Sequence, residues 1–363
     1  YCRGGIAISR ILECRGVAVL PEEMSRERFN WLEQWTLNPR EDIIRTTGSE
    51  SNVREIYEAC DALERDTDNV ILNQFSEFAN YLCHRSITGP AVGRLYESVA
   101  DERSRFRGFI TGTGSAGTIA AGDYLKAHYG AAIIATEPLE CPTMLNNGYG
   151  AHGIQGIGDK HIPLIHNVMN MDAVVGVSDV GPDLLNVLFN TEAGRTYLAG
   201  RVGMNDAGIE SLSHMGLSSL ANIQAAIKVA RHHDMDEHDV IVCMATDGAD
   251  LYGSELEATR ERHFANGFGA TEAAEVFGRC LMGCEPAHVL ELTSGERERI
   301  FNLGYYTWVE QRGISVEDFD RRRHQSFWDD IAAELPQWDE RIRAFNALSL
   351  IHISEPTRRR LES

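Results

Sequence analysis

The sequence has few lysines, no paired cysteine motif and no long hydrophobic run. Almost all of its basic residues are arginines, and the three lysines are Lys126, Lys160 and Lys228. The eight cysteines are scattered without a CxxC pair, which argues against a disulfide framework or a structural zinc cluster and favours reduced thiols. No apolar run reaches the roughly 20 residues that a membrane-spanning helix needs. We therefore expect a globular, cytoplasmic protein with no metal site and no membrane partner.

Acidic residues dominate the charge of the chain. The 54 acidic residues outnumber the 34 basic ones, which gives a formal net charge of −20. Such a surface would repel a nucleic acid or an anionic membrane, so the composition favours small-molecule chemistry and no nucleic-acid partner. The 363 residues, 43% of them hydrophobic, are enough for two packed lobes and an appendage.

The most informative stretch, residues 108–122, is a glycine-rich turn between an apolar approach and a helix of small residues. Glycine lets backbone N–H groups come close to phosphate oxygens, and the first turn of a helix adds unpaired donors and the positive end of its dipole. The sequence therefore predicts a phosphate cradle. Its candidate ligand residues are Gly112, Thr113, Gly114, Ser115, Ala116, Gly117 and Thr118.

The same turn also fits a dinucleotide-binding fingerprint. Gly112, Gly114 and Gly117 have the G-x-G-x-x-G spacing, and Glu137 follows where that motif expects an acidic residue for a ribose. A nicotinamide-dependent (NAD) oxidoreductase is therefore one alternative, and a turn that binds no ligand is another. The apolar run 131–135 favours a ligand, because it completes a βαβ unit around the turn.

Apolar runs alternate with amphipathic stretches over roughly the first two thirds of the chain. The predicted strands are residues 16–20, 42–45 and 70–72 in a first part, and residues near 108–111, 131–136, 173–177 and 239–244 in a second. This alternation predicts an α/β fold with a mostly parallel, twisted sheet. Strand signals disappear from residue 253 to 346, which predicts a helical extension.

Three further segments carry a resemblance to a known family. They are Asn73-Gln-Phe-Ser-Glu-Phe-Ala-Asn80 with Thr88-Gly-Pro90, His152-Gly-Ile-Gln-Gly-Ile-Gly158 with Ile162-Pro163, and Gly216-Leu-Ser-Ser219. In this order and spacing they resemble the Asn-Gln-Phe segment, the His-x-Ile-Gln-Gly-Ile-Gly loop and the Gly-x-Ser-Ser helix start of the cysteine synthase and cystathionine β-synthase family. The Gln-Gly-Ile-Gly loop is far more specific than a glycine fingerprint.

The resemblance implies a fold type II enzyme that depends on pyridoxal 5′-phosphate (PLP), with the three-layer α/β/α architecture of tryptophan synthase β-like proteins. The corresponding divisions are residues 1–87 for a small lobe, 88–252 for a large PLP-binding lobe and 253–347 for the helical extension. Residues 348–363 are similar to translated sequencing-adapter sequence, so we expect a non-native tail there.

The same resemblance implies roles for single residues. The cradle is expected to hold the PLP phosphate, Thr246 to supply a hydroxyl to the pyridine nitrogen, and Gln74 to hold the substrate carboxylate. Without the resemblance, Thr246 could be an ordinary strand-end cap, and Gln74 a polar residue that satisfies backbone groups. A neutral hydroxyl partner leaves the pyridine nitrogen largely unprotonated, so the cofactor withdraws electrons less strongly. This favours β-elimination chemistry over transamination.

The family's Schiff-base lysine, and the Ser/Thr-x-Gly-Asn loop that follows it, are missing from the sequence. The opening Tyr1-Cys-Arg-Gly-Gly resembles the helix directly after that loop. We therefore expect the lysine upstream of Tyr1 and a chain that is an amino-terminally truncated fragment without turnover. Lys126 and Lys228 are expected on solvated helix faces. Lys160 follows the Gln-Gly-Ile-Gly loop, and we expect a surface charge there as well.

The complete enzyme is expected to catalyse β-elimination or β-replacement on a small amino acid such as serine, an activated serine or cysteine. The family implies a homodimer. Besides the oxidoreductase, a further alternative is a non-catalytic ligand-binding or scaffold protein whose helical extension mediates assembly. The run His232-His-Asp-Met-Asp-Glu-His238 concentrates potential metal ligands, but it lies between a helix and a strand, so we expect a solvated connection.

Overall fold

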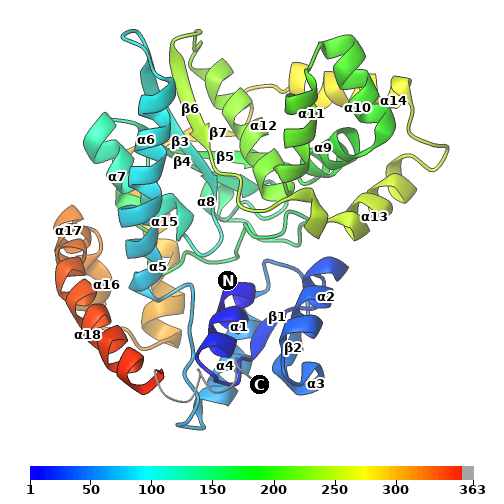
Figure 1. Cartoon of the computed structure of the whole chain (residues 1–363). Coiled ribbons are helices and arrows are strands. Elements are labelled where there is room, and N and C mark those ends of the chain that lie inside the picture. The colour runs from blue at the N-terminus through cyan, green and yellow to red at the C-terminus, as the bar shows by residue number, and fades with distance from the viewer. Residues whose placement is uncertain (354–363) are drawn as a thin grey trace.

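The computed structural model describes residues 1–353, which form two parallel-stranded lobes and a mainly helical carboxyl-terminal part (Figure 1). The seven strands are β1 (Ala18–Pro21), β2 (Ile43–Thr46), β3 (Arg105–Gly112), β4 (Ala132–Pro138), β5 (Ala173–Val177), β6 (Asp239–Cys243) and β7 (Val289–Glu291). In the part of the chain that the structure describes, no helix is both long and apolar enough to cross a membrane.

The smaller lobe is built on the parallel pair β1 and β2, with Ala18 opposite Ile43. Its helices are α1 (Cys2–Ile11), α2 (Arg26–Trp35), α3 (Pro39–Asp42) and α4 (Val53–Glu64). Phe29 and Leu32 lie one helical turn apart on α2, and both pack onto Ala18 and Leu20 of β1. Because those two strand residues alternate with Val19, the buried face of β1 has the expected period of two.

The predicted third strand of this lobe, residues 70–72, is wrong. The segment is not part of either sheet, and its apolar side chains Val70 and Leu72 are 82% and 63% exposed. A strand needs a neighbour to satisfy its backbone groups and a core to cover its side chains. Residues 70–72 have neither.

The larger lobe contains a five-stranded sheet in the order β6-β3-β4-β5-β7. The first four strands are mutually parallel, as the alternation of strands and helices predicts. The helices associated with this lobe are α5 (Phe78–Cys83), α6 (Gly89–Val99), α7 (Ala121–Tyr129), α8 (Thr143–Asn146), α9 (Val180–Asn190), α10 (Glu192–Tyr197), α11 (Asp206–Ser211) and α12 (Leu217–His232).

Neighbouring residues of the central strands belong to different cores. Ile133 and Val174 lie in one hydrophobic cluster together with Trp308 of the carboxyl-terminal part, whereas Ile134 and Val175 lie in another with residues of α12. Because successive strand side chains point to opposite faces, the sheet is covered on both sides. The expected three-layer α/β/α fold is confirmed.

The carboxyl-terminal part is mainly helical, and it packs tightly against the larger lobe. Its helices are α13 (Gly253–His263), α14 (Ala270–Phe277), α15 (Ser294–Leu303), α16 (Val316–Arg321), α17 (Gln325–Ala333) and α18 (Leu335–Ile353). Trp308 is 2% exposed, and its indole N–H donates to the carbonyl oxygen of Ile162 at 2.7 Å. Trp328 is fully buried and contacts Phe78 and Tyr81 of α5.

Two expectations for this part of the chain are wrong. Strand signals do not disappear, because β7 pairs antiparallel with β5, with Val289 opposite Val175. The last helix also does not end before residue 348, since α18 continues to Ile353. The rest of the expected tail, 354–363, lies outside the described residues.

Candidate active site

The glycine-rich turn leads from the end of β3 to α7 and encloses a small cavity, which we call the cradle cavity. It is lined by Thr111, Gly112, Gly114, Ser115, Ala116, Gly117, Thr118, Gly156, Ile157, Ser218, Asn222 and Thr246. Six of the seven predicted cradle residues and Thr246 are therefore brought together. Gly156 and Ile157 belong to the Gln-Gly-Ile-Gly loop, so both sequence motifs line one cavity.

Glycine is required in the cradle by the close approach of this loop. A Cβ atom at Gly114 would lie 2.8 Å from the carbonyl oxygen of Gly156, and one at Gly112 would overlap the side chain of Ile157. The turn itself is tight, because Ala116 has a φ of 63°, a left-handed conformation that is uncommon for residues other than glycine. The wall of the cavity is consequently made largely of backbone.

Thr113 is the one predicted cradle residue that does not line the cavity. It is buried, and both its backbone N–H and its hydroxyl donate to the carbonyl oxygen of Thr136 on β4, at 3.0 and 3.3 Å. Its own carbonyl oxygen accepts from the N–H of Gly158 at 2.8 Å. Thr113 therefore fixes the turn to β4 and to the Gln-Gly-Ile-Gly loop.

A pair of hydroxyl groups lies on the other side of the cradle cavity. The hydroxyls of Ser218 and Thr246 are 3.0 Å apart, and either could donate to the other. Asn222, one turn further along α12, donates to the carbonyl oxygen of Met244 at 3.0 Å, while its buried Oδ1 has no protein partner. Ser218 and Asn222 were not predicted, although Ser218 lies in the matched Gly216–Ser219 segment.

No ionisable side chain lines the cradle cavity in the described structure, and the lysines lie elsewhere. Lys126 forms an ion pair with Asp172 at 2.8 Å. Lys228 donates to the carbonyl oxygen of Gly176 at 2.6 Å. Both are partly buried, so the expectation of freely solvated lysines is wrong for these two. Lys160 donates to Asn52 at 3.0 Å near the surface.

A second cavity lies between the two lobes and shares Gly114, Ser115 and Gly156 with the first. We call it the interlobe cavity. It is lined by Tyr1, Cys2, Arg3, Val19, Leu20, Pro21, Met24, Arg28, Leu32, Glu50, Ile56, Gln74, Phe75, Gly114, Ser115, Gly156 and Asp159. Gln74 thus lies in the cavity beside the cradle, and its role in holding the substrate carboxylate stays a prediction. The amide of Asn80 donates to the carbonyl oxygen of Gln74 and to the hydroxyl of Ser115, at 3.0 and 3.2 Å, and so joins the two segments.

Arg28 of α2 connects the smaller lobe to two loops of the larger one. Its guanidinium donates to Gln155 of the Gln-Gly-Ile-Gly loop at 3.0 Å and to Asp247 at 2.9 Å. The side chains of Arg28 and Asp247 are only 19% and 18% exposed. The hydroxyl of Tyr252 also donates to Asp247, at 2.6 Å. Sequence reasoning missed this network, because Arg28 is 127 residues from Gln155 and 219 residues from Asp247.

Glu137 does not face the cradle. Its two carboxylate oxygens accept the backbone N–H groups of Met144 and Leu145 at 2.9 and 2.8 Å. Burial raises its pKa to about 7, against the lowering effect of these two hydrogen bonds. Both oxygens are therefore engaged with α8, and Glu137 is only 2% exposed, so its carboxyl is not available to a ribose.

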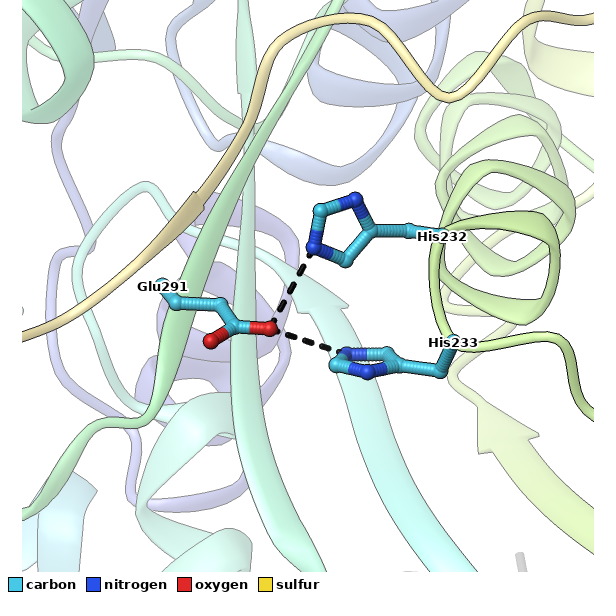
Figure 2. A group of neighbouring side chains, drawn as sticks. All are labelled: His232, His233 and Glu291. Carbon is cyan, nitrogen blue, oxygen red and sulfur yellow. Dashed lines mark hydrogen bonds and ion pairs between the residues drawn. The ribbon is translucent and has the colours of Figure 1, made fainter.

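Among the described residues, one group brings three potential metal ligands together, at the end of α12. The side chains of His232 and His233 both approach one carboxylate oxygen of Glu291 on β7, at 3.2 and 3.7 Å (Figure 2). All three are exposed or nearly so. This arrangement was not predicted, because Glu291 is distant in the sequence; that the protein has no metal site stays a prediction.

Comparison with known proteins decides which family these motifs represent. No family model matches the chain. A probable cysteine synthase of Bacillus subtilis is 27% identical over 253 residues, which cover 68% of this chain and 73% of the relative. Cysteine synthase A of Escherichia coli is 27% identical over 268 residues, which cover 70% of this chain and 74% of the relative. The chain is thus similar to proteins of the cysteine synthase family over 68–70% of its length. Members of this family are PLP-dependent enzymes, and the relatives support PLP-dependent β-replacement.

Solved structures agree on the fold. A hydrogen sulfide-producing enzyme from Fusobacterium nucleatum has a TM-score of 0.57 and 22% identity, covering 80% of this chain and 77% of that one. An O-acetylserine dependent cystathionine β-synthase from Helicobacter pylori has a TM-score of 0.53 and 22% identity, covering 69% and 72%. The chain thus has the fold type II architecture of the cysteine synthase family.

The cradle cavity suits the PLP of this family in three respects. Its glycine-rich wall lets backbone N–H groups approach a phosphate, and the helix that follows directs the positive end of its dipole toward it. A hydroxyl pair, Ser218 and Thr246, provides a neutral partner for a ring nitrogen. The unpaired Oδ1 of Asn222 leaves one acceptor for a ligand or a water. The amine that holds the cofactor aldehyde is not among the lining groups, and its position upstream of Tyr1 stays a prediction.

Proposed function

We propose that this chain binds PLP in the cradle cavity and belongs to an enzyme that catalyses β-elimination or β-replacement on a small amino acid. Serine, an O-activated serine and cysteine are the substrates that we propose. The observation that supports this best is the meeting of the glycine turn, the Gln-Gly-Ile-Gly loop and the Ser218–Thr246 hydroxyl pair around one uncharged cavity.

The proposed residue roles follow from this arrangement. Backbone N–H groups of residues 114–118 hold the phosphate, and the hydroxyl of Thr246 contacts the pyridine nitrogen. When bound, PLP supplies an electron sink for the pair of electrons left at the substrate α-carbon. The amide of Gln74 donates to the substrate carboxylate at the mouth of the interlobe cavity. A neutral hydroxyl at the ring nitrogen limits the strength of the sink, which favours loss of the β-substituent.

A homodimer and a cytoplasmic location are part of this proposal, on the basis of the family. The oxidoreductase alternative has little support, because both oxygens of Glu137 are bound to α8. The scaffold alternative is also weakened, since the carboxyl-terminal part is packed into the core of the larger lobe through Trp308 and Trp328.

Cofactor binding tests the proposal first. The chain is titrated with PLP, and binding is followed by the ³¹P signal of the phosphate and by fluorescence. We expect Gly114→Val to weaken binding by about 100-fold, or about 2.7 kcal/mol, because its side chain would meet the carbonyl oxygen of Gly156. Gly200→Ala is the matched control, since nothing lies within 4 Å of its added Cβ atom. Tight NAD binding without PLP binding would contradict the proposal.

Turnover tests it second. The PLP-loaded chain is assayed with O-acetylserine and sulfide, and separately with cysteine, for the amino-acid product and for released sulfide. Because none of the three lysines reaches the cradle cavity, each assay is repeated with a small primary amine in solution. We expect turnover that depends on the added amine. Turnover without added amine would contradict the expectation that the Schiff-base lysine is not one of the three lysines of this chain.

A further inference from the structure

Two carboxyl groups in the interlobe cavity have an oxygen that is shielded from water and has no hydrogen-bond partner. These atoms are Oδ2 of Asp159 and Oε2 of Glu50. Asp159 is 7% exposed, whereas Glu50 is partly buried. A buried carboxyl without a partner is costly unless it is protonated or is completed by a ligand. Glu50 has the charge of Arg28 and the backbone of Gly156 beside its carboxyl, so Asp159 is the group that the protein structure alone leaves unexplained.

The backbone around Asp159 is fixed, and its side chain is not. The preceding Gly158 has a φ of 85° and donates its N–H to the carbonyl oxygen of Thr113 at 2.8 Å. The carbonyl oxygen of Asp159 accepts from the hydroxyl of Thr143 at 2.8 Å. Two rigid contacts thus hold the residue beside the cradle, in the cavity that Gln74 and Ser115 also line. With Gln74 holding the substrate carboxylate as proposed, a bound amino acid shares this cavity with Asp159.

The surroundings of Asp159 favour its neutral form. Desolvation raises the pKa of Asp159 well above its usual range, and the negative charge of Glu50 raises it further. Burial raises the pKa of Glu50 as well, although the positive charge of Arg28 opposes this effect.

The ionisable groups around Asp159 are Tyr1, Cys2 and Arg3 at the start of α1, Arg28 on α2, Glu50, Tyr57 on α4, Cys141 after β4, and Glu137, His161 and His166 behind it. Of the two arginines in this set, Arg28 is bonded to Asp247 and Gln155, and Arg3 lies over the ring of Trp31.

We propose that Asp159 is a catalytic residue that exchanges a proton with the β-substituent of the substrate, and that this substituent is a hydroxyl or thiol group. This inference rests on the proposed function and deepens it by naming the substrate class. Glu50 is a positioning residue in this scheme, because its charge acts on Asp159 across the cavity.

The proposed step is balanced in protons and electrons. As the bond from Cβ to oxygen or sulfur breaks, its electron pair leaves with the heteroatom, the pair at Cα forms the Cα=Cβ double bond, and the carboxyl proton of Asp159 moves to the heteroatom. Water or a thiol departs, and Asp159 is left as a carboxylate. In the replacement direction, an incoming thiol gives its proton to this carboxylate, its sulfur forms the new bond to Cβ, the Cα=Cβ double bond opens with its π pair returning to Cα, and Asp159 regains its acid form.

The chemistry of the leaving group selects the substrate class. A carboxylate leaves without a proton, because its conjugate acid has a pKa of about 4. A thiolate is a poorer leaving group, with a thiol pKa of about 8.5, and hydroxide is far worse, with a pKa of about 15.7 for water. A neutral acid beside Cβ therefore helps serine most, cysteine next, and an O-acetylated serine hardly at all.

A leaving-group series tests this order. Asp159→Asn replaces the neutral acid by a group of the same shape without a transferable proton, so the fold is expected to persist. In the amine-supplemented assay we expect kcat/KM to fall by at least about 100-fold with serine and cysteine, and by less than about threefold with O-acetylserine. The matched control is Asp123→Asn, a buried carboxylate on α7 that is bonded to Tyr81, Asn167 and Asn170 and should affect all three substrates equally. A uniform loss in Asp159→Asn would overturn the inference.

A second measurement separates this inference from the proposed function. Aspartate carboxyl carbons are labelled with ¹³C in the chain as it exists, and the signal lost in Asp159→Asn is assigned and titrated. An Asp159 carboxyl that remains protonated at pH 7 supports the inference, even if no substrate turns over and the proposed function fails. Titration near the ordinary value of about 3.9 overturns the inference, even if PLP binds and O-acetylserine reacts. Glu50→Gln should lower the Asp159 midpoint, since it removes the neighbouring charge.

Discussion

The cradle cavity and the interlobe cavity share a wall but hold opposite kinds of chemistry. The described lining of the cradle cavity contains backbone, hydroxyl and amide groups without an ionisable side chain, whereas Arg28, Glu50 and Asp159 all reach the interlobe cavity. A permanently charged ligand group can be held by fixed dipoles, which need no proton. A reacting group that gains or loses a proton needs side chains whose protonation can change. The cradle cavity therefore has the kind of groups that binding needs. The interlobe cavity has the kind of groups that a reaction with proton transfer needs.

The largest effect is expected for Arg28, whose hydrogen bonds connect the two lobes. Arg28→Met leaves Asp247 and Gln155 without their guanidinium partner in a partly buried place. We expect the free energy of unfolding to fall by about 3 kcal/mol, while PLP affinity changes by less than about threefold, because Arg28 does not line the cradle cavity. Urea unfolding and PLP titration measure the two quantities. Arg54→Met, at the exposed pair with Glu58, is the control and should cost less than about 0.5 kcal/mol.

A buried carboxyl outside both cavities shows whether burial alone keeps a carboxyl neutral in this protein. Burial raises the pKa of Asp183 to about 7, with a further contribution from the charge of Asp179. The folded state then binds more protons than the unfolded state between about pH 4 and 7, so the free energy of unfolding falls as the pH rises through that window.

Asp183→Asn removes this dependence. Relative to the variant, the wild type should lose on the order of 2 kcal/mol between pH 4 and pH 8, as measured by urea unfolding at several pH values. Asp66→Asn, an exposed substitution, serves as the control and should leave the wild-type profile in place. Parallel profiles for the wild type and Asp183→Asn would show that a carboxyl buried to this degree still ionises normally.

A substitution in the Ser218–Thr246 hydroxyl pair tests whether the cradle cavity binds its ligand through neutral groups. Ser218→Ala removes one member of the pair that approaches Thr246 at 3.0 Å. A single neutral hydrogen bond contributes about 1 kcal/mol, so PLP affinity should fall by about fivefold, with little change in the pH dependence of binding. Ser213→Ala, at an exposed hydroxyl, is the matched control. A loss of 100-fold or a new pH dependence would mean that the ring-nitrogen side is not held by neutral groups.

The smallest effect is expected at the exposed cluster of Figure 2. Glu291→Gln breaks the contacts with His232 and His233, yet exposed pairs contribute little, so unfolding should change by less than about 0.5 kcal/mol. Zinc ions at 100 µM, an excess chosen to saturate sites of micromolar affinity, should leave the thermal midpoint where it is. A zinc-dependent increase that disappears in Glu291→Gln would overturn the prediction of no metal site.

The sequence was sufficient for features whose cause is local. Glycine spacing predicted the cradle, and apolar runs such as 131–136 predicted the central strands. Both could be predicted because backbone conformation and the alternation of buried residues depend on residues that are close in the sequence. Residues 70–72 looked like a strand on the same grounds, but without a partner strand or a core they are not one. β7 shows the converse, since its three residues become a strand only by pairing with β5.

The parts of the site that were missed depend on contacts between distant segments. Asp159 directly follows the matched loop that ends at Gly158, yet nothing in that motif shows that the carboxyl of Asp159 is buried with an unpartnered oxygen. From the sequence alone, Arg28 is expected on the polar face of an amphipathic helix. Only the folded structure places Asp247 beside it. Thr113 was assigned to the cradle on position alone, whereas its hydrogen bonds to Thr136 turn it away from the cavity. Local pattern predicts elements, and only packing decides side-chain partners.

The position of β7 has a consequence for how this protein is made. An unpaired outer edge of β5 would expose a row of backbone donors and acceptors that could recruit another chain. Residues 289–291 cover that edge, and the ribosome adds them only after the other four strands of the sheet. The sheet is therefore sealed late in synthesis, and a chain shortened before residue 289 should aggregate through β5 even though every cradle residue is present.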